Sequence, residues 1–174
     1  EIVAQILASA FNAVDPGTAV KNFLHKNPLA VKKRIFAFGL GKASCAMMQA
    51  LADEAPLTDA LVITKHASPL TFEPVTVIEG NHPIPGSASV RGGNVAINFL
   101  SQITQDDLLI CLISGGGSAL MTAPRVPLED LQTLTSALLA CGARIDEINI
   151  LRRHLDMLKG GGLANLANGA QIIS

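Results

Sequence analysis

The sequence lacks the residue types on which several large classes of proteins depend. Its 174 residues contain no Trp and no Tyr, and six Phe are the only aromatic residues. The 13 Lys and Arg are balanced by 14 Asp and Glu, so the net charge is −1 and no basic surface is indicated. Because nucleic-acid binding relies on clustered cations and aromatic stacking, we expect no nucleic-acid partner.

Long apolar segments are also missing. No apolar run reaches the roughly 18 residues that a membrane-spanning helix needs, so no membrane partner is expected. Residues 1–5 show no basic segment followed by a cleavable apolar one, and no signal peptide is predicted. The chain does not begin with Met and its end resembles the start of a strand, so we expect a fragment of a longer protein.

Cysteine and histidine are too sparse for a disulfide framework or a metal site. The three cysteines, Cys45, Cys111 and Cys141, are odd in number and show no CxxC spacing. We predict that all three are reduced thiols buried in the core, which suits the cytoplasm. No two of the 4 His lie at the spacing of zinc ligands, so no metal-ligating residue is predicted.

Apolar residues, by contrast, are abundant. They make up 49% of the chain against 16% charged residues, enough for the large core of one domain. Short apolar runs typical of buried parallel strands alternate with helical patterns. The predicted strands are 34–38, 59–64, 75–78, 107–113 and a last one from 170. The predicted helices are 2–13, 16–25, 42–55, 87–102, 127–140, 145–158 and 162–168. This alternation predicts the α/β class, with a three-layer, Rossmann-like parallel sheet covered by helices on both faces, spanning 1–174 as part of a larger domain.

Open parallel sheets bind ligands at the carboxyl ends of their strands, so the loops there carry the functional predictions. The first such loop, 39–44, has the spacing G-x-G-x-x-S between a strand and a helix. Gly41 lets the backbone approach a ligand, Lys42 adds a mobile positive charge, and Ser44 lies near the start of the predicted helix 42–55, whose free amides attract anions. A tight turn with a solvated Lys42 is the alternative interpretation.

The end of the second predicted strand bears on the choice of nucleotide. A dinucleotide-binding fold needs an acidic residue near that point to hold the ribose, and this chain has Lys65 and His66 there. This argues against NAD but leaves NADP open, because a 2′-phosphate accepts a basic partner.

A second loop has three consecutive glycines, Gly115, Gly116 and Gly117, between Ser114 and Ser118. Consecutive glycines are entropically costly and are justified where backbone amides curl around a ligand as an anion nest. The two flanking hydroxyls can add hydrogen bonds to phosphate oxygens. The spacing is not the G-x-S-x-G nucleophile elbow of hydrolases. We therefore predict a phosphate or carboxylate site here, with a flexible turn as the alternative.

Two further regions carry polar side chains suited to anionic ligands. His82 lies in a Pro-stiffened loop, where it can bond a substrate hydroxyl or carboxylate or act as a base. Arg152, Arg153 and Lys159 lie near a predicted helix end and a glycine run, and we predict anion binding through Arg152 and Lys159. The alternatives are a His that bonds its own loop and cations that favour a helix C-terminus.

These groups occur in a characteristic order along the chain. They are Gly39-Leu40-Gly41-Lys42-Ala43, His82-Pro83-Ile84-Pro85, Ser114-Gly115-Gly116-Gly117-Ser118-Ala119-Leu120, Asn149 through His154, and Lys159-Gly160-Gly161. The order resembles class II glycerate 2-kinase, a family often labelled hydroxypyruvate reductase, over nearly the whole chain. In that family a Rossmann-like domain is followed by a smaller α/β domain, and the active site lies between them.

The resemblance implies ATP-dependent, Mg²⁺-assisted phosphorylation of D-glycerate at its 2-hydroxyl. It implies that Lys42 is a catalytic cation, that 114–118 is an anion-binding loop, and that His82 and Arg152 position the substrate. Lys42 would neutralise either the glycerate carboxylate or the γ-phosphate, and the loop would hold the other anion. ATP and Mg²⁺ are the expected cofactors, with no metal ligand identified in this chain.

The sequence departs from the family's pattern at three positions. Gly86 stands where an acidic residue is usual, Asp156 where Ser is common, and Gly162 where a basic residue is common. The family's next acidic stretch lies beyond Ser174. Two other functions stay open as alternatives: an NADP-dependent hydroxypyruvate reductase, and a non-catalytic module that binds phosphate or a phosphosugar.

Overall fold

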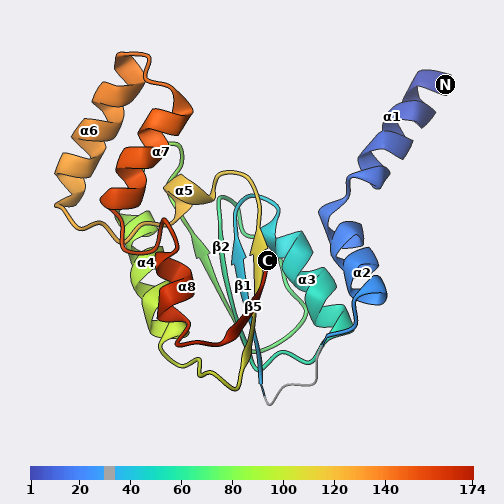
Figure 1. Cartoon of the computed structure of the whole chain (residues 1–174). Coiled ribbons are helices and arrows are strands. Elements are labelled where there is room, and N and C mark those ends of the chain that lie inside the picture. Colours follow the sequence, from blue (N-terminus) through green and yellow to red (C-terminus); the bar gives the residue numbers. More distant parts are fainter. Residues whose placement is uncertain (30–33) are drawn as a thin grey trace.

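The computed structural model describes residues 1–29 and 34–174, which form a five-stranded sheet surrounded by helices (Figure 1). The strands are β1 Ile35–Leu40, β2 Asp59–Thr64, β3 Val75–Glu79, β4 Leu108–Ile113 and β5 Gln171–Ile173. Their order in the sheet is β3-β2-β1-β4-β5, and every neighbouring pair is parallel. The predicted α/β class with a parallel sheet is confirmed.

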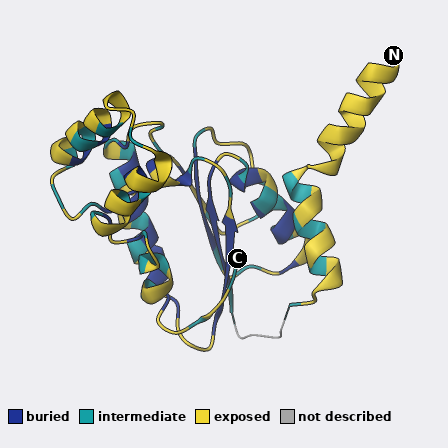
Figure 2. Ribbon diagram, turned by 45° about the horizontal axis from the view of Figure 1, so that its top comes forward, coloured by how far each residue is buried: buried dark blue, intermediate teal, exposed yellow. Residues whose placement is uncertain are grey.

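Helices cover both faces of the sheet. They are α1 Ile2–Ala13, α2 Pro16–Lys26, α3 Ser44–Glu54, α4 Ser87–Leu100, α5 Gly117–Leu120, α6 Leu128–Ala140, α7 Ile145–His154 and α8 Gly162–Leu166. In Figure 1, α2 and α3 lie on one side of the strands, and α4 and α8 on the other. Successive side chains of a strand point to opposite faces of the sheet, so each strand contributes to two cores. Phe36 and Phe38 pack in the core under α4, and Ala37 packs in the core under α3. Figure 2 shows these buried strands between the two helical layers.

The carboxyl ends of the strands meet along one edge of the sheet. Leu40, at the end of β1, is paired with Ile63 in β2 and with Ile113 at the end of β4. Thr64, at the end of β2, is paired with Glu79 at the end of β3. The loops that follow these strands therefore start side by side, as the functional predictions require.

The predicted helix 145–158 is shorter in the structure, because α7 ends at His154. The residues that follow pair with another segment of the chain instead of continuing the helix. The Leu155 carbonyl accepts a hydrogen bond from the Arg125 amide at 2.8 Å. The short helix α5 was not among the predicted elements, because its four residues are too few for a helical pattern to be recognised in the sequence.

The cysteine prediction is partly wrong. Cys45 and Cys111 are buried free thiols as predicted, and burial raises the pKa of Cys111 to about 11. Cys141 is exposed, because it follows the last turn of α6 at the end of a helix that projects from the body. The Cys141 thiol donates a hydrogen bond to the Leu138 carbonyl in that last turn, at 3.3 Å.

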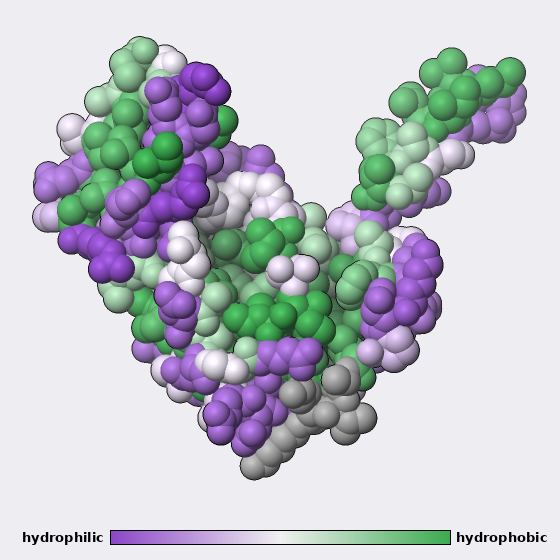
Figure 3. Space-filling view, viewed as in Figure 1, coloured by the Kyte–Doolittle hydropathy of each residue, from purple (hydrophilic) through white to green (hydrophobic). Residues whose placement is uncertain are grey.

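Helix α1 projects away from the sheet (Figures 1 and 3). None of its residues is buried, and its apolar side chains are open to solvent, Phe11 by 71% and Ile2 by 73%. The helix forms where its apolar spacing predicts it, yet that spacing is not used for packing against the described core. No helix in the described ranges is long and apolar enough to cross a membrane.

Candidate functional site

The first and second glycine loops are joined by two backbone–backbone hydrogen bonds and one bond from a backbone amide to a side chain. The Lys42 amide donates to the Gly115 carbonyl at 3.0 Å, and the Ala43 amide donates to Ser114 Oγ at 3.0 Å. The Ser114 amide donates to the Leu40 carbonyl at 2.8 Å. The two loops therefore form one surface at the edge of the sheet, although they are more than 70 residues apart in the chain.

This junction uses up the amides that the sequence suggested for anion binding in the first loop. The Gly41 amide donates to the Ile63 carbonyl at 2.9 Å, and Gly41 is buried with φ at +119°, where a β-carbon would collide with Ser114. Ser44 is fully buried, and its hydroxyl donates to the Gly41 carbonyl at 2.7 Å. Gly41 and Ser44 therefore shape the loops rather than face a ligand, whereas Ser114 joins the loops through its hydroxyl and also lines the cavity described below.

The glycine run of the second loop keeps its amides available. Among the described residues, no acceptor is bonded to the amides of Gly115, Gly116, Gly117 or Ser118. Gly116 adopts the left-handed φ of +94° that starts α5, and the space around Gly115 is open to 4 Å. Successive unbonded amides at such a turn create a positive concavity, so the loop has the form of an anion nest.

Two side chains from other loops reach over Gly116. A β-carbon built on Gly116 would lie 3.4 Å from Lys42 Cε and 3.4 Å from His82 Cδ2, with His82 Nε2 at 3.5 Å. Lys42 is exposed and its ammonium has no bonded acceptor in the described chain, while His82 is half-buried. Loops that follow β1, β3 and β4 thus bring a cation, an imidazole and free amides to one place.

The loop that carries His82 is fixed by its own hydrogen bonds. The Asn81 amide donates to Ser89 Oγ at 3.0 Å, and Asn81 Oδ1 accepts from the Ala88 amide at 3.1 Å. Burial, with the charges of Lys42 and Lys65, lowers the pKa of His82 below its ordinary value of 6.5. The imidazole is therefore neutral at pH 7 and can accept a proton.

A cavity of about 520 Å³ opens on the other side of the second loop. Arg152, Arg153 and Lys159 lie on its wall together with Ser118. Arg152 Nη1 lies 3.5 Å from Ser118 Oγ, and burial lowers the pKa of Arg152 from its ordinary value. Because Arg stays charged even so, the cavity presents a partly desolvated positive charge beside the anion nest.

Lys159 is held in place by groups around the cavity. Its ammonium donates to the Met121 carbonyl at 2.9 Å and is paired with the Asp156 carboxylate. Burial lowers the pKa of Lys159, and Asp156 opposes this effect. These contacts hold Lys159 at the predicted anion site. They also place the Asp156 carboxylate, to which sequence analysis gave no role in the site, beside the Lys159 ammonium.

Sequence analysis named three further residues without assigning them to this site. Lys65, after β2, acts electrostatically on His82, and Asn149 lines the cavity through α7. Asp156 is 3% exposed and so belongs to the interior. The position of Lys65 at a strand end was a usable signal, whereas the burial of Asp156 depends on pairing between distant segments and has no local sequence pattern.

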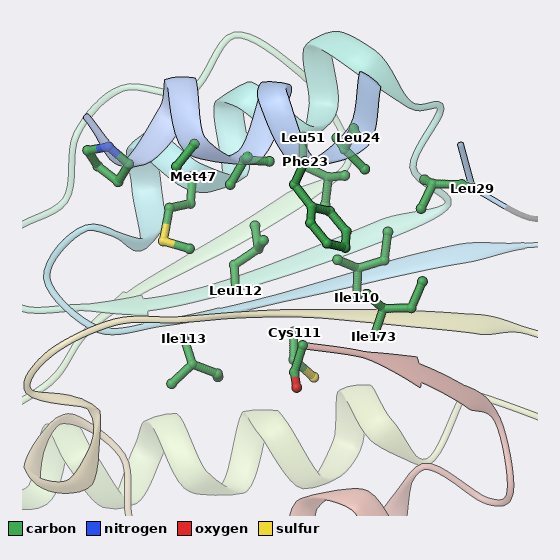
Figure 4. A pocket seen from close by; sticks show the side chains of 14 residues that line it. Phe23, Leu24, Leu29, Met47, Leu51, Ile110, Cys111, Leu112, Ile113 and Ile173 are labelled. Atoms are coloured by element: carbon green, nitrogen blue, oxygen red, sulfur yellow. The ribbon is translucent and has the colours of Figure 1, made fainter. Parts of the chain in front are cut away.

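A second hollow, of about 490 Å³, lies between α2 and α3 on one side and β4 and β5 on the other (Figure 4). Its walls include Phe23, Met47, Leu112 and Ile173, and none of the lining residues within 1–29 and 34–174 has a charged side chain. Figure 3 shows hydrophobic residues at the centre of the molecule's concave face. Without cations or converging donors this hollow does not suit an anionic ligand.

No group of three or more His, Cys, Asp and Glu side chains gathers within residues 1–29 and 34–174 in a way that could hold a metal ion. The buried acid near the site, Asp156, is occupied by Lys159 and by the Thr122 hydroxyl, which donates to it at 2.6 Å. The described chain therefore offers no multi-ligand protein cage for a Mg²⁺ ion.

Comparisons of the sequence with family models and with known proteins point to the same group of relatives. A family described as "Domain of unknown function (DUF4147)" matches residues 2–174. Glycerate 2-kinase of Pyrococcus horikoshii is 35% identical over 99% of this chain, which corresponds to 42% of that protein. A protein of Agrobacterium vitis with the provisional name hydroxypyruvate reductase is 34% identical over 100% of this chain and 40% of its own length.

The same similarity appears among solved structures. The crystal structure of glycerate kinase from Thermotoga maritima superimposes with a TM-score of 0.88 and 34% identity, over 97% of this chain and 41% of that one. The chain therefore spans about two fifths of the length of these relatives.

Proposed function

Since this chain belongs to the DUF4147 family, we propose that it is the N-terminal Rossmann-like part of a glycerate 2-kinase, which transfers the γ-phosphoryl group of ATP to the 2-hydroxyl of D-glycerate. Relatives named as glycerate kinases, at 30–38% identity over 99–100% of the chain, support the proposal. The observation that carries it is the meeting of Lys42, His82 and the free amides of 115–118 at one edge of the sheet.

Phosphoryl transfer suits this arrangement because it requires alignment and positive charge more than covalent chemistry. Both reactants are anions, and the site offers two adjacent groups of donors. Lys42 and the loop 115–118 form one group, and Arg152 with Lys159 forms the other across Ser118. In our proposal one group binds the phosphates and the other the carboxylate, so the hydroxyl lies between them.

We propose that His82 is the general base that accepts the proton of the 2-hydroxyl group. Its Nε2 atom faces Gly116, and the imidazole is neutral at pH 7 for the reasons given above. The 2-hydroxyl oxygen attacks the γ-phosphorus, its proton passes to His82 Nε2, and the bond to the ADP oxygen breaks. Lys42 offsets the charge that spreads over the phosphoryl oxygens during the transfer.

Kinases of this kind use ATP with Mg²⁺, which screens the phosphates when it is bound. Since the described residues include no group of three or more metal-ligating side chains, no step above depends on a metal ligand from this chain. We also propose that residues 1–174 form one domain of a cytoplasmic protein, in keeping with the buried thiols of Cys45 and Cys111.

The proposal is tested with the full-length protein in three parallel assays. We expect ADP release that depends on D-glycerate, no oxidation of NADPH by hydroxypyruvate, and a product phosphorylated at the 2-position. NADPH oxidation without ADP release would establish the reductase instead. The name of the Agrobacterium vitis relative is the observation that favours this second function. Binding of ATP without either turnover would establish a non-catalytic module.

A further inference from the structure

Asp156 is a buried carboxylate whose hydrogen bonds converge at the edge of the polar cavity. Its Oδ2 atom accepts from Thr122 Oγ1 at 2.6 Å and pairs with the Lys159 ammonium, and its Oδ1 atom accepts from the Leu158 amide at 2.9 Å. Asp156 and Thr122 are 3% and 1% exposed. The carboxylate itself is absent from the cavity wall, whereas Lys159 lines it.

We infer that Asp156 is a positioning residue, which holds the Lys159 ammonium on the cavity wall so that it can bind an anionic group of the substrates. This inference rests on the proposed function. An ammonium has three N–H donors, and the described bonds to Asp156 and to the Met121 carbonyl use two of them. The remaining donor is free to serve a ligand in the cavity.

The backbone around the pair makes this position rigid. Asp156 forms an antiparallel bridge with Pro124, and the Met157 amide donates to the Ala123 carbonyl at 2.9 Å. The segment that carries Asp156 and Lys159 is thus bonded to the segment that follows α5. Because the second glycine loop leads directly into α5, Lys159 is fixed relative to the anion nest.

Charge explains why a carboxylate is needed at this point. Two charged groups of the described chain act on the Lys159 ammonium, Asp156 in its own segment and Arg152 from α7, and Arg153 lines the same cavity. The segment 118–122 contributes the Met121 carbonyl, which accepts from this ammonium. Burial and Arg152 both disfavour the protonated amine, and Asp156 is the group that favours it. Without Asp156, the Lys159 ammonium would lose a hydrogen-bond partner that orients it. Its pKa would also fall, so it would lose its proton more readily.

The first test compares the full-length protein with its Asp156→Asn variant by NMR of ¹³C-labelled lysine side chains. The expected result is a lower pKa for Lys159 in the variant, because the counter-charge is gone while burial and Arg152 remain. This readout does not require catalysis. An unchanged pKa of Lys159 would overturn the inference whether or not the protein is a glycerate kinase.

The second test measures KM for D-glycerate and for ATP at pH 6.5 and pH 8.5. Asp156→Asn is expected to raise one of the two KM values about tenfold or more at pH 8.5, less at pH 6.5, and to leave kcat within about twofold. Equal KM values in variant and wild type at both pH values would show that Lys159 binds no substrate. If the wild type shows no turnover, the proposed function fails, and calorimetric binding of ATP at both pH values replaces KM as the test.

Matched variants separate positioning from folding. Asp130→Asn removes an exposed carboxylate on α6 and is expected to change neither KM nor the pKa of Lys159. Lys159→Arg in the Asp156→Asn background restores a permanent positive charge, so the difference in KM between the two pH values should disappear. If Asp156→Asn is too unstable to purify, Thr122→Val removes one of its hydrogen bonds and should raise the same KM by a smaller factor. An unaltered KM in Thr122→Val would then contradict the inference.

Discussion

Lys42 combines a fixed backbone with a free side chain. Its amide is bonded to Gly115, and its Cε atom lies near the glycine run, yet the side chain is exposed. In the proposed reaction the ammonium is free to follow the phosphoryl group from one reactant to the other while its attachment point stays still. This is the behaviour expected of a cation that acts on the transferred group.

Replacing Lys42 with Met removes the charge and keeps most of the aliphatic stem. We expect kcat of the full-length protein to fall about 100- to 1,000-fold, the usual cost of losing one group that stabilises developing charge. Steady-state ADP release measures the effect. The matched control is Lys26→Met on α2, an exposed lysine away from the site, which should keep full activity; turnover of Lys42→Met close to that control would remove Lys42 from the mechanism.

The pH dependence of the reaction follows from the surroundings of His82. Since burial, Lys42 and Lys65 lower the pKa of His82, the proposed base becomes protonated only when the pH falls below 6.5, the ordinary pKa of histidine. Lys65→Gln removes one positive charge, so the imidazolium becomes easier to form and the pKa rises. The acidic limb of kcat/KM should therefore move to higher pH in this variant, whereas Lys26→Gln should leave it in place. A limb that does not move would mean that His82 is not the group that titrates.

At the scale of elements, the start of β4 depends on one buried carboxylate. Asp107 is fully buried and accepts two hydrogen bonds from the Arg34 guanidinium, at 2.8 and 2.6 Å, and one from the Thr104 amide at 2.7 Å. These bonds connect the chain before β1 with the turn before β4. The hydrogen bond from Arg34 is the main reason why the pKa of Asp107 is lowered to about 2.

This arrangement gives the fold a specific sensitivity to acid. Because the pKa of Asp107 is lower in the folded protein than its ordinary value of 3.8, its stabilising effect is complete above that value and is lost as the pH falls toward about 2. Asp107→Asn should lower the free energy of unfolding by about 1–3 kcal/mol at pH 7. In urea titrations the difference from wild type should shrink between pH 4 and pH 2. The exposed neighbour gives the control Asp106→Asn, which should show neither effect.

The elements themselves were largely predictable from sequence, because each strand is a short apolar run between helical patterns. The same logic located the loops at the strand ends, including Lys42 and the glycine run of 115–117. The sequence did not reveal that the two glycine loops are hydrogen-bonded to each other. The Ala43 amide, for example, donates to Ser114 Oγ, 71 positions away. A local pattern cannot specify such a pairing, and for the same reason Ser44 was assigned to ligand binding although it is buried.

At the scale of the whole molecule, the polar site and the apolar surfaces are separate. The cations line the edge of the sheet and the cavity beside Ser118, whereas the apolar hollow lies between α2, α3, β4 and β5. The hollow and α1 expose more hydrophobic surface than single scattered residues would (Figure 3). Neither surface contributes charge to the anion site, so changes there should affect stability and association before they affect ligand binding.

Two phenylalanines show how differently the molecule uses its hydrophobic residues. Phe38 in β1 is fully buried, while Phe11 in α1 is 71% exposed. Phe38→Ala should lower the free energy of unfolding by about 3–5 kcal/mol, because it leaves a cavity in the core under α4. Phe11→Ala should change it by no more than about 0.5 kcal/mol in the 174-residue chain, since no packing is lost. Urea unfolding followed by circular dichroism measures both. A large loss for Phe11→Ala would show that α1 packs on the body in solution, contrary to its position in the structure.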